Sequence, residues 1–365
     1  MRILGIVIIG LLLTACGSDQ STPTAVGTID AERTYNWKLV TTWPKNYPGL
    51  GTAPETFADL VERMSAGRLQ IEVFGAGQLV PAMEVFDAVS QGTAQMGHGA
   101  AYYWAGKAKG AAFFAAVPFG LNAQEMNAWL HHGGGLELWR ELYAPFNLIP
   151  FAGGNTGVQM AGWFNREIDS IDDLAGLKMR IPGLGGDVIS LAGGTSWNIA
   201  GGDIYTAMQT GVIDATEWVG PYNDLAFGLH QVAKYYYYPG WHEPGVMAEL
   251  TVNANAYAGL PDDLQAIIEV AARAINQDML DEYTAKNNRA LVDLVDNHGV
   301  DLRRLPKPVL AQLRRLSAQV VDELAAETEL TGRIGDSLKA FKAQAMAYHV
   351  ISEQAYNDAR RADDE

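Results

Sequence analysis

The chain has 365 residues, 42 of them acidic and 26 basic, which gives a formal net charge of −16 and one cysteine. An acidic surface repels nucleic acid and anionic membrane faces, so we expect no nucleic-acid partner, and an anionic ligand needs a local cationic site. One cysteine excludes an intrachain disulfide. The 48% of apolar residues suffices for one or two domains that share a large core.

The N-terminus has the pattern of an export signal. The apolar run 3–13 is shorter than the roughly 20 residues of a membrane-spanning helix, but it is typical of a signal peptide. The residues at 13–16, Leu-Thr-Ala-Cys, resemble the bacterial lipobox, in which the cysteine carries the lipid anchor. We predict a lipoprotein signal peptide over 1–16, lipidation of Cys16, and a flexible Ser- and Gly-rich tether over 17–34. An ordinary cleaved signal with an incidental cysteine is the alternative.

The first half of the chain alternates between predicted strands and helices. The apolar periodicity and the turn residues give, in chain order, strand 35–43, helix 52–66, strand 69–74, helix 81–91, strand 94–99, helix 125–143 and strand 148–159. Because consecutive strands joined by a helix are usually parallel neighbours, this alternation predicts an α/β sheet with parallel strands.

The second half adds a second set of strands and then a helical region. The predicted elements are strands 178–181, 196–199, 212–218, 235–239 and 248–254, helix 204–210, helix 262–297, strand 300–305 and a helical stretch 308–356. We therefore predict an α/β fold with two lobes and a long C-terminal helical arm. The predicted parts are lobe I over 35–155, lobe II over 156–248, a segment 249–305 that both lobes share, and the arm over 306–365. The arm can pack on its own domain or reach a second subunit, and the pattern leaves both open.

Catalytic motifs are incomplete in this sequence. His132-Gly133-Gly134-Gly135 is similar to the oxyanion loop of some esterases, but the chain has no Gly-x-Ser-x-Gly nucleophile elbow to accompany it. It also has no full dinucleotide fingerprint, no phosphate loop with lysine and no His-Glu-x-x-His. We therefore expect a binding protein that catalyses nothing.

The candidate binding residues lie in the second lobe. Arg180 ends a short apolar strand, where open α/β sheets bind ligands, and its planar guanidinium fits a carboxylate. The pattern does not separate this role from a structural ion pair. Glu217 and Glu243 each stand beside a tryptophan in apolar surroundings, where an unpaired carboxylate is costly. They can pair with arginine or share a hard cation such as Na⁺ or Ca²⁺, with the amide oxygen of Gln159 as a further ligand.

Six segments together resemble a known family, the solute receptors of TRAP transporters (tripartite ATP-independent periplasmic transporters). The likeness is greatest to the branch that binds 2-oxo acids and related monocarboxylates, and it runs from about residue 35 past residue 305. The segments that carry it are TTWP at 41–44, GAAYYW at 99–104, GNTGVQ at 154–159, KMRIP at 178–182, GVIDATEW at 211–218 and WHEP at 241–244.

The resemblance implies a two-lobed α/β fold of the periplasmic-binding-protein type with hinge strands. It also implies a periplasmic receptor that binds a small organic acid anion, such as pyruvate, a longer 2-oxo acid or lactate. It implies that integral-membrane TRAP subunits are the partners and that an ion gradient drives uptake. In this reading Arg180 binds the substrate carboxylate. A metal ion, with Na⁺ favoured over Ca²⁺, bridges to the substrate from Gln159, Glu217, the backbone carbonyl of Trp218 and Glu243.

Three residues complete the implied substrate site. Tyr102 and Tyr103 resemble the tyrosines that line the pocket from the first lobe, with core packing as the alternative for each. Asn155 is a further substrate contact, and Gln159 touches both substrate and metal unless its amide serves a backbone hydrogen bond. Two other functions stay open: a metal-dependent enzyme acting on 2-oxo acids, and a lipid-anchored ligand sensor. The C-terminal helix leaves a homodimer open as well.

Overall fold

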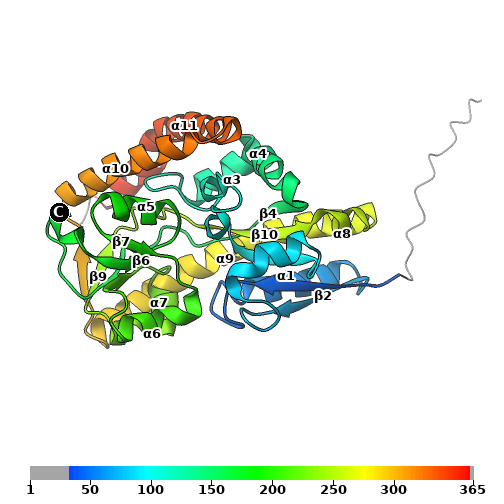
Figure 1. The fold of residues 1–365 in the computed structure, drawn as a ribbon, viewed down its shortest axis with the longest axis horizontal. Coiled ribbons are helices and arrows are strands. Elements are labelled where there is room, and N and C mark those ends of the chain that lie inside the picture. Colours follow the sequence, from blue (N-terminus) through cyan, green and yellow to red (C-terminus); the bar gives the residue numbers. More distant parts are fainter. Residues whose placement is uncertain (1–32, 362–365) are drawn as a thin grey trace, which may run out of the picture. The chain divides into compact units, whose positions relative to one another are not determined.

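The computed structural model describes residues 33–361, and within them the chain forms two mixed sheets covered by helices (Figure 1). The predicted signal peptide, Cys16 and the tether up to residue 32 lie outside the described residues. No helix within 33–361 has both the length and the apolar composition needed to cross a membrane.

The first sheet forms the centre of lobe I. Its strands, in spatial order, are β2 (Leu69–Phe74), β1 (Tyr35–Thr41), β3 (Met96–Ala100), β10 (Met247–Asn253) and β4 (Leu148–Asn155). The predicted parallel pairing is confirmed for β1 with β2 and with β3, which α1 (Ala53–Met64) and α2 (Val85–Ser90) connect. β10 returns from far along the chain and pairs antiparallel with β3 and β4, because a strand entering from the other lobe runs against its neighbours.

The second sheet forms the centre of lobe II. Its spatial order is β11 (Asp301–Arg304), β9 (Tyr235–Tyr238), β5 (Gly162–Phe164), β8 (Ala215–Thr216), β6 (Lys178–Arg180) and β7 (Thr195–Trp197). β6 pairs in parallel with β7 and β8, whereas β5 pairs antiparallel with β8 and β9. Three helices connect these strands: α5 (Gly183–Leu191), α6 (Ile204–Gln209) and α7 (Pro221–Phe227). The expected two-lobed α/β fold is therefore present.

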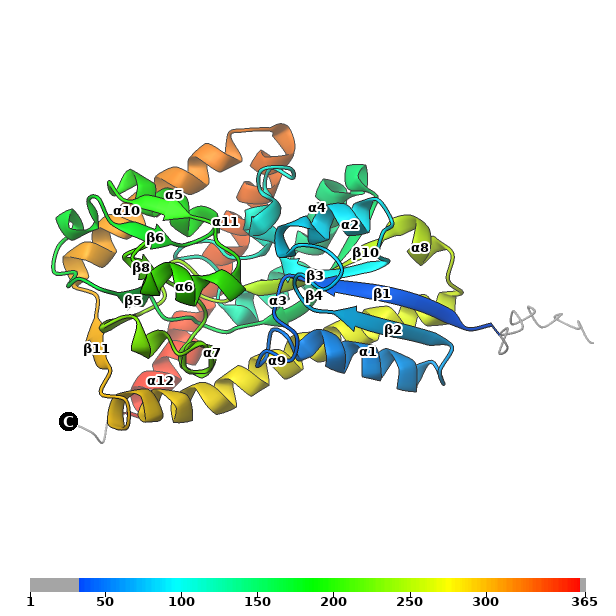
Figure 2. The same cartoon turned by 60° about the horizontal axis from the view of Figure 1, so that its bottom comes forward.

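The two lobes are joined by loops and by one long helix. The chain crosses from β4 to β5 through residues 156–161 and returns from β9 to β10 through residues 239–246. After the short α8 (Ala254–Ala258), helix α9 (Asp262–Asp296) packs on β4 and α1 of lobe I and on α7 of lobe II (Figure 2). This helix is thus a common support for both lobes.

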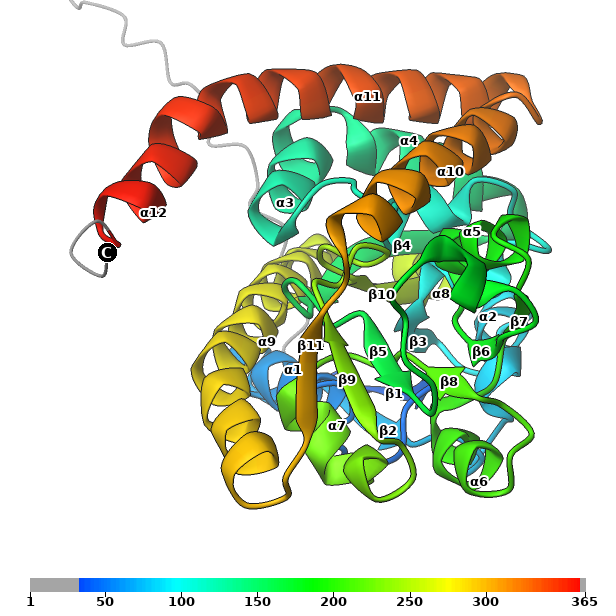
Figure 3. The same cartoon turned by 90° about the vertical axis from the view of Figure 1, so that its left-hand side faces the viewer.

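Two predicted helices are divided in the structure. The stretch 125–143 forms α3 (Ala123–His132) and α4 (Gly135–Tyr143), because Gly134 adopts a left-handed backbone with φ +83° between them. The arm forms α10 (Lys307–Ala325), α11 (Glu329–His349) and α12 (Ala355–Ala359), with Thr328 capping α11. α10 packs on α5, and α11 packs on α3 and α4 before α12 extends beyond them (Figure 3). The first part of the arm therefore packs on its own domain.

Short 3₁₀ segments connect the larger elements. They are η1 (Ala82–Glu84), η2 (Ala101–Trp104), η3 (Ala111–Phe114), η4 (Ala144–Phe146), η5 (Ile171–Leu174), η6 (Gly201–Asp203) and η7 (Leu229–Gln231), and the arm holds one π-helical turn, η8 (Val350–Gln354). η2 carries Tyr102 and Tyr103, the two tyrosines predicted to line the pocket, directly after β3.

Candidate functional site

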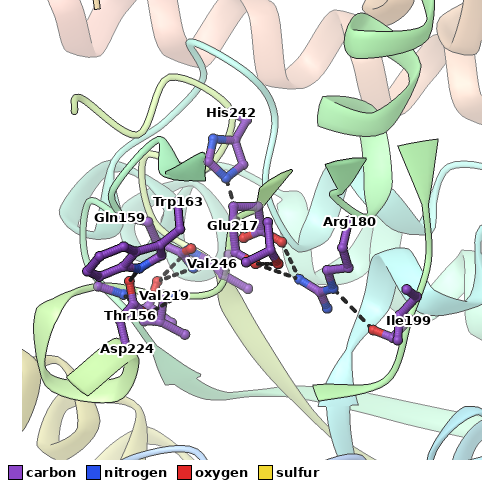
Figure 4. Close-up of polar contacts among 12 residues, drawn as sticks. Thr156, Gln159, Trp163, Arg180, Ile199, Glu217, Val219, Asp224, His242 and Val246 are labelled. Carbon is purple, nitrogen blue, oxygen red and sulfur yellow. Dashed lines mark hydrogen bonds and ion pairs between the residues drawn. The ribbon is translucent and has the colours of Figure 1, made fainter. Parts of the chain in front are cut away.

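Arg180 lies at the carboxyl end of β6 and links the two lobes. Its side chain is 1% exposed, and its Nε–H donates to the backbone carbonyl of Ile199 at 3.1 Å (Figure 4). One terminal nitrogen donates to the side chain of Glu217 and, at 3.4 Å, to the Glu217 carbonyl. The other donates to the Tyr103 hydroxyl of lobe I at 3.2 Å. The structural ion pair, which the sequence left open as the alternative to a ligand-binding role, is therefore present, and Arg180 also bonds to a residue of lobe I.

A compact acidic group surrounds this arginine. Glu217 follows β8, and its second carboxylate oxygen lies 3.4 Å from Nε2 of His242. Glu217, His242 and Glu243 are all buried, and each offers a ligand atom within 4.8 Å of the other two. Burial and then the charge of Glu217 raise the pKa of Glu243 well above its ordinary value. Neutralising the charge of Glu243, or balancing it with a cation, therefore stabilises the cluster of Glu217, His242 and Glu243.

Two side-chain oxygens in this region fit a metal ion. The amide nitrogen of Gln159 donates to Thr156 at 3.2 Å, and its Oε1 is buried and has no hydrogen-bond partner among the described residues. Glu243 Oε2 is likewise buried and without a hydrogen-bond partner within 33–361. The backbone N–H of Gln159 donates to the Glu243 carbonyl at 3.2 Å, which holds the two residues together. Buried polar atoms are normally paired, and hard cations bind such oxygens. The donor set therefore suits Na⁺ or Ca²⁺.

The loop after Glu217 is fixed by a carboxylate that the sequence reasoning missed. Asp224 accepts hydrogen bonds from the backbone N–H groups of Val219 at 3.3 Å and Gly220 at 3.2 Å. It also accepts from Trp163 Nε1 at 2.9 Å (Figure 4) and from the Tyr236 hydroxyl at 2.6 Å. Burial raises the pKa of Asp224 to about 6, although the hydrogen bonds from Tyr236, Trp163 and Val219 act in the opposite direction. This arrangement holds the backbone next to Trp218.

Trp218, the predicted backbone ligand, lies against the arginine. The centre of its ring is 5.2 Å from the guanidinium carbon of Arg180, within the range of a cation–π contact. Its indole is buried at 4% exposure, so the contact is shielded from water. Arg180, Glu217 and Trp218 are therefore brought together as the sequence suggested.

The predicted lobe I residues lie on two sides of the group. Tyr102 and Tyr103 pack edge to face with ring centres 4.9 Å apart, and Gly183 at the start of α5 abuts Tyr102. Beyond them is a cavity of about 760 Å³, lined also by α5 and α10, to which Arg180, Glu217 and Glu243 do not contribute. Asn155 ends β4, where its side-chain Oδ1 accepts from the Gly157 N–H at 2.9 Å, while its Nδ2 is buried and has no hydrogen-bond partner among residues 33–361.

His242 is the other residue that sequence reasoning missed. It is 1% exposed, its Nε2 faces Glu217, and its Nδ1 has no hydrogen-bond partner. Its position next to Glu243, in the segment Trp241-His242-Glu243-Pro244, was the signal that could have identified it. For Asp224 the sequence held no comparable signal, because its partners are set by long-range packing.

Comparison with known proteins identifies the fold and the family. Residues 39–328 match the family of bacterial extracellular solute-binding proteins, family 7. The chain is 44% identical over 324 residues to the monocarboxylate 2-oxoacid-binding periplasmic protein of Nostoc sp. strain PCC 7120, and the match covers 88% of each chain.

Three solved structures have the same fold. A TRAP periplasmic solute-binding protein from Pseudoalteromonas atlantica T6c, with bound sodium and pyruvate, is 42% identical with a TM-score of 0.87, over 89% of this chain and 99% of that one. One from Colwellia psychrerythraea, with bound calcium and pyruvate, is 43% identical with a TM-score of 0.87, over 90% and 100%. One from Bordetella bronchiseptica RB50, a dimer with calcium and picolinate, is 37% identical with a TM-score of 0.88, over 90% and 98%. The chain therefore belongs to family 7 of the bacterial extracellular solute-binding proteins and is the solute-binding receptor of a TRAP transporter.

Proposed function

We propose that this receptor captures a short monocarboxylate with a second oxygen at C2, such as pyruvate, another 2-oxo acid or lactate, together with a bridging metal ion. The observation that carries this proposal is the buried group of Arg180, Glu217, Glu243 and Gln159 between the lobes, with two side-chain oxygens that have no partner. The relatives that bind pyruvate with sodium or calcium support it.

The proposed roles follow from charge. The guanidinium of Arg180 offers planar N–H donors for the ligand carboxylate, but Glu217 already pairs with it. A second carboxylate, Glu243, makes the group acidic, so an incoming anion needs a cation held by Gln159, Glu217, the Trp218 carbonyl and Glu243. We favour Na⁺ over Ca²⁺ in this role. Such an ion would balance the carboxylates and present a positive charge to the oxygens of the acid.

Closure of the two lobes, divided near residues 155 and 248, would then exclude water from the ligand. Tyr102, Tyr103 and Asn155 would contact it from the side of lobe I. A lower local dielectric strengthens the contact of Arg180 with the carboxylate. We propose capture without turnover, since the family consists of substrate-binding receptors. Turnover of pyruvate or lactate with added divalent metal would favour a metal-dependent enzyme instead, and the lack of a neighbouring gene for a transporter subunit would favour a sensor.

The proposed setting is the periplasmic face of a membrane. A lipid on Cys16 would hold the receptor there for delivery to the integral-membrane TRAP subunits. A Cys16→Ser variant should then move from the membrane to the soluble fraction, and its retention on the membrane would contradict lipid anchoring.

A homodimer is proposed through the end of the arm. Large apolar side chains near its C-terminus are exposed: Met346, Tyr348, Val350, Ile351 and Tyr356. Their burial against a second copy would remove apolar area from water. Native mass spectrometry of gently purified protein tests this and reports any co-purified acid and metal at the same time.

Calorimetry with pyruvate and lactate tests the binding site. Arg180→Ala should abolish binding, and Arg180→Lys, which keeps Glu217 paired with a charge, should weaken it because lysine lacks the planar fork. The control is Arg166→Ala, since Arg166 is 40% exposed and pairs with Asp214 elsewhere in lobe II. Unchanged affinity in Arg180→Ala would reject the site. Equal affinity with and without sodium and divalent ions would reject the bridging metal.

A further inference from the structure

The loop between β1 and α1 reaches from lobe I into lobe II. At its tip, the Tyr47 hydroxyl donates to the Asn223 carbonyl at 2.6 Å and accepts from Trp218 Nε1 at 3.1 Å. The Tyr47 ring also packs on Phe227 with 4.4 Å between ring centres. One tyrosine of lobe I is therefore bonded to two residues that lie on either side of the Gly220 turn in lobe II.

The amide of Asn223 completes this contact with α9. Its Nδ2 donates to the Pro48 carbonyl at 2.8 Å, and its Oδ1 accepts from the Tyr283 hydroxyl at 2.7 Å. Gly49 has φ +66°, and a Cβ there would lie 2.4 Å from the Tyr283 oxygen, so the loop backbone fits closely against the helix. We refer to Tyr47, Pro48, Trp218, Asn223 and Tyr283 as the Tyr47 clasp.

Trp218 connects the Tyr47 clasp to the proposed binding site. Its ring lies 5.2 Å from the Arg180 guanidinium carbon, and Trp43 of lobe I packs edge-on against it at 6.2 Å. It follows Glu217 in the chain, and the same indole that bonds to Tyr47 lies against Arg180, so a movement of the indole changes its contact with Arg180. The clasp and the site therefore share one side chain.

We propose that Tyr47 is a positioning residue that slows release of the ligand. Resting on the proposed function, this inference assigns Tyr47 to the bound state of the receptor, although the hydrogen bonds of its hydroxyl within the described part of the chain go to Trp218 and Asn223 and not to the proposed ligand-binding residues. Its two hydrogen bonds cross from lobe I to lobe II, so the lobes cannot separate at this point without breaking them. Opening of the lobes exposes these buried groups or leaves them unpaired. The free-energy cost of that step slows release of the ligand.

Tyr47→Phe isolates the hydroxyl because it keeps the ring against Phe227. Trp218 Nε1–H and the Asn223 carbonyl then lose their hydroxyl partner. Loss of one or two buried hydrogen bonds should raise the dissociation rate about tenfold and leave the association rate within about twofold. The matched control is Tyr143→Phe, whose hydroxyl donates to Glu249 at 2.7 Å wholly inside lobe I.

Stopped-flow binding of pyruvate in saturating NaCl, or CaCl₂ if sodium is inactive, measures both rates. If the role of Tyr47 is purely structural, Tyr47→Phe lowers the midpoint of urea unfolding, as Tyr143→Phe does, but leaves the rate of ligand dissociation unchanged. Dissociation that is no faster in Tyr47→Phe than in Tyr143→Phe overturns the inference.

A second measurement separates this inference from the proposed function. If the wild type binds no 2-oxo acid and no lactate with either ion, the proposed function fails while the Tyr47 clasp remains testable without ligand. Amide hydrogen exchange over residues 217–223 should then be faster in Tyr47→Phe than in Tyr143→Phe and the wild type. Equal rates of amide exchange over these residues in the two variants would contradict the proposed role of the Tyr47 clasp.

Discussion

Glu243→Gln is a direct test of the proposed metal site because the substitution removes a charge and little volume. Glu217 and Glu243 are both buried, with ligand oxygens within 4.8 Å of each other. At an effective dielectric constant of about 20, two unit charges at that distance repel by about 3.5 kcal/mol. Burial and this repulsion together raise the pKa of Glu243.

The sign of the pH effect follows from that raised pKa. The folded protein holds the Glu243 proton more tightly than the unfolded chain, so the contribution of Glu243 to the stability of the metal-free wild type is greatest at low pH. This contribution is lost as pH rises from the ordinary carboxyl pKa towards the raised one. Glu243→Gln has no proton to lose there. Without metal, at a pH where Glu243 of the wild type is ionised, the variant should be more stable than the wild type by up to roughly 3 kcal/mol, the size of the repulsion that it removes, less the attraction of Glu243 to Arg180.

Urea unfolding at pH 6 and pH 8 in sodium-free buffer with a chelator measures this difference. Addition of NaCl or CaCl₂ should then stabilise the wild type and leave Glu243→Gln nearly unchanged. Glu249→Gln is the control: Glu249 is also buried, but it bonds to Trp104 and Tyr143, so its variant should keep the full metal response. A Glu243→Gln protein that is less stable than the wild type at pH 8, or that gains as much from metal, refutes the reasoning.

Three further predictions concern stability. Burial raises the pKa of Glu249 from an ordinary 4.5 to about 7, so the wild type loses roughly 3 kcal/mol of folding stability as pH rises between these values. Glu249→Gln should remove this loss, which a pH profile of urea unfolding measures. Gly49→Ala should lower the free energy of unfolding by about 1–3 kcal/mol, because its Cβ would meet the Tyr283 hydroxyl from a left-handed backbone. Asn122→Ala should cost about 1 kcal/mol in the same assay, since Asn122 and Glu125 form the capping box of α3.

Local periodicity was enough to predict most elements of lobe I. β2 was predicted with its observed bounds, because its alternating residues and flanking glycines lie within one short window. β5 (Gly162–Phe164) was missed, since three residues are too few to show a period and its pairing depends on β8 and β9. The break at Gly134 was also missed, because apolar spacing continues on both sides of it. The apolar pattern of the sequence thus predicts most helices and strands, while the order of strands in a sheet and short breaks in helices depend on long-range packing.

The site was predictable to the extent that single residues stood in unusual surroundings. Arg180 and Glu217 each drew attention as charges in apolar segments, but their pairing depends on the register of β6 with β8, which aligns Arg180 with Thr216. Asp224 and Tyr47 did not stand out in the sequence in this way. Their roles arise from partners as far as 176 residues away, which one sequence does not display.

The pairing of Arg180 with Glu217 bears on how ligand and metal would bind. The arginine contributes one positive charge, and Glu217 with an ionised Glu243 contributes two negative charges, so the group has no net attraction for an anion. A bound cation changes that balance, and a bound carboxylate in turn favours the cation. Linkage requires the two effects to be equal, so sodium or calcium would raise the affinity for the acid by the factor by which the acid raises the affinity for the ion. A receptor with a net charge of −16 can in this way bind an anion tightly only when the ion is present.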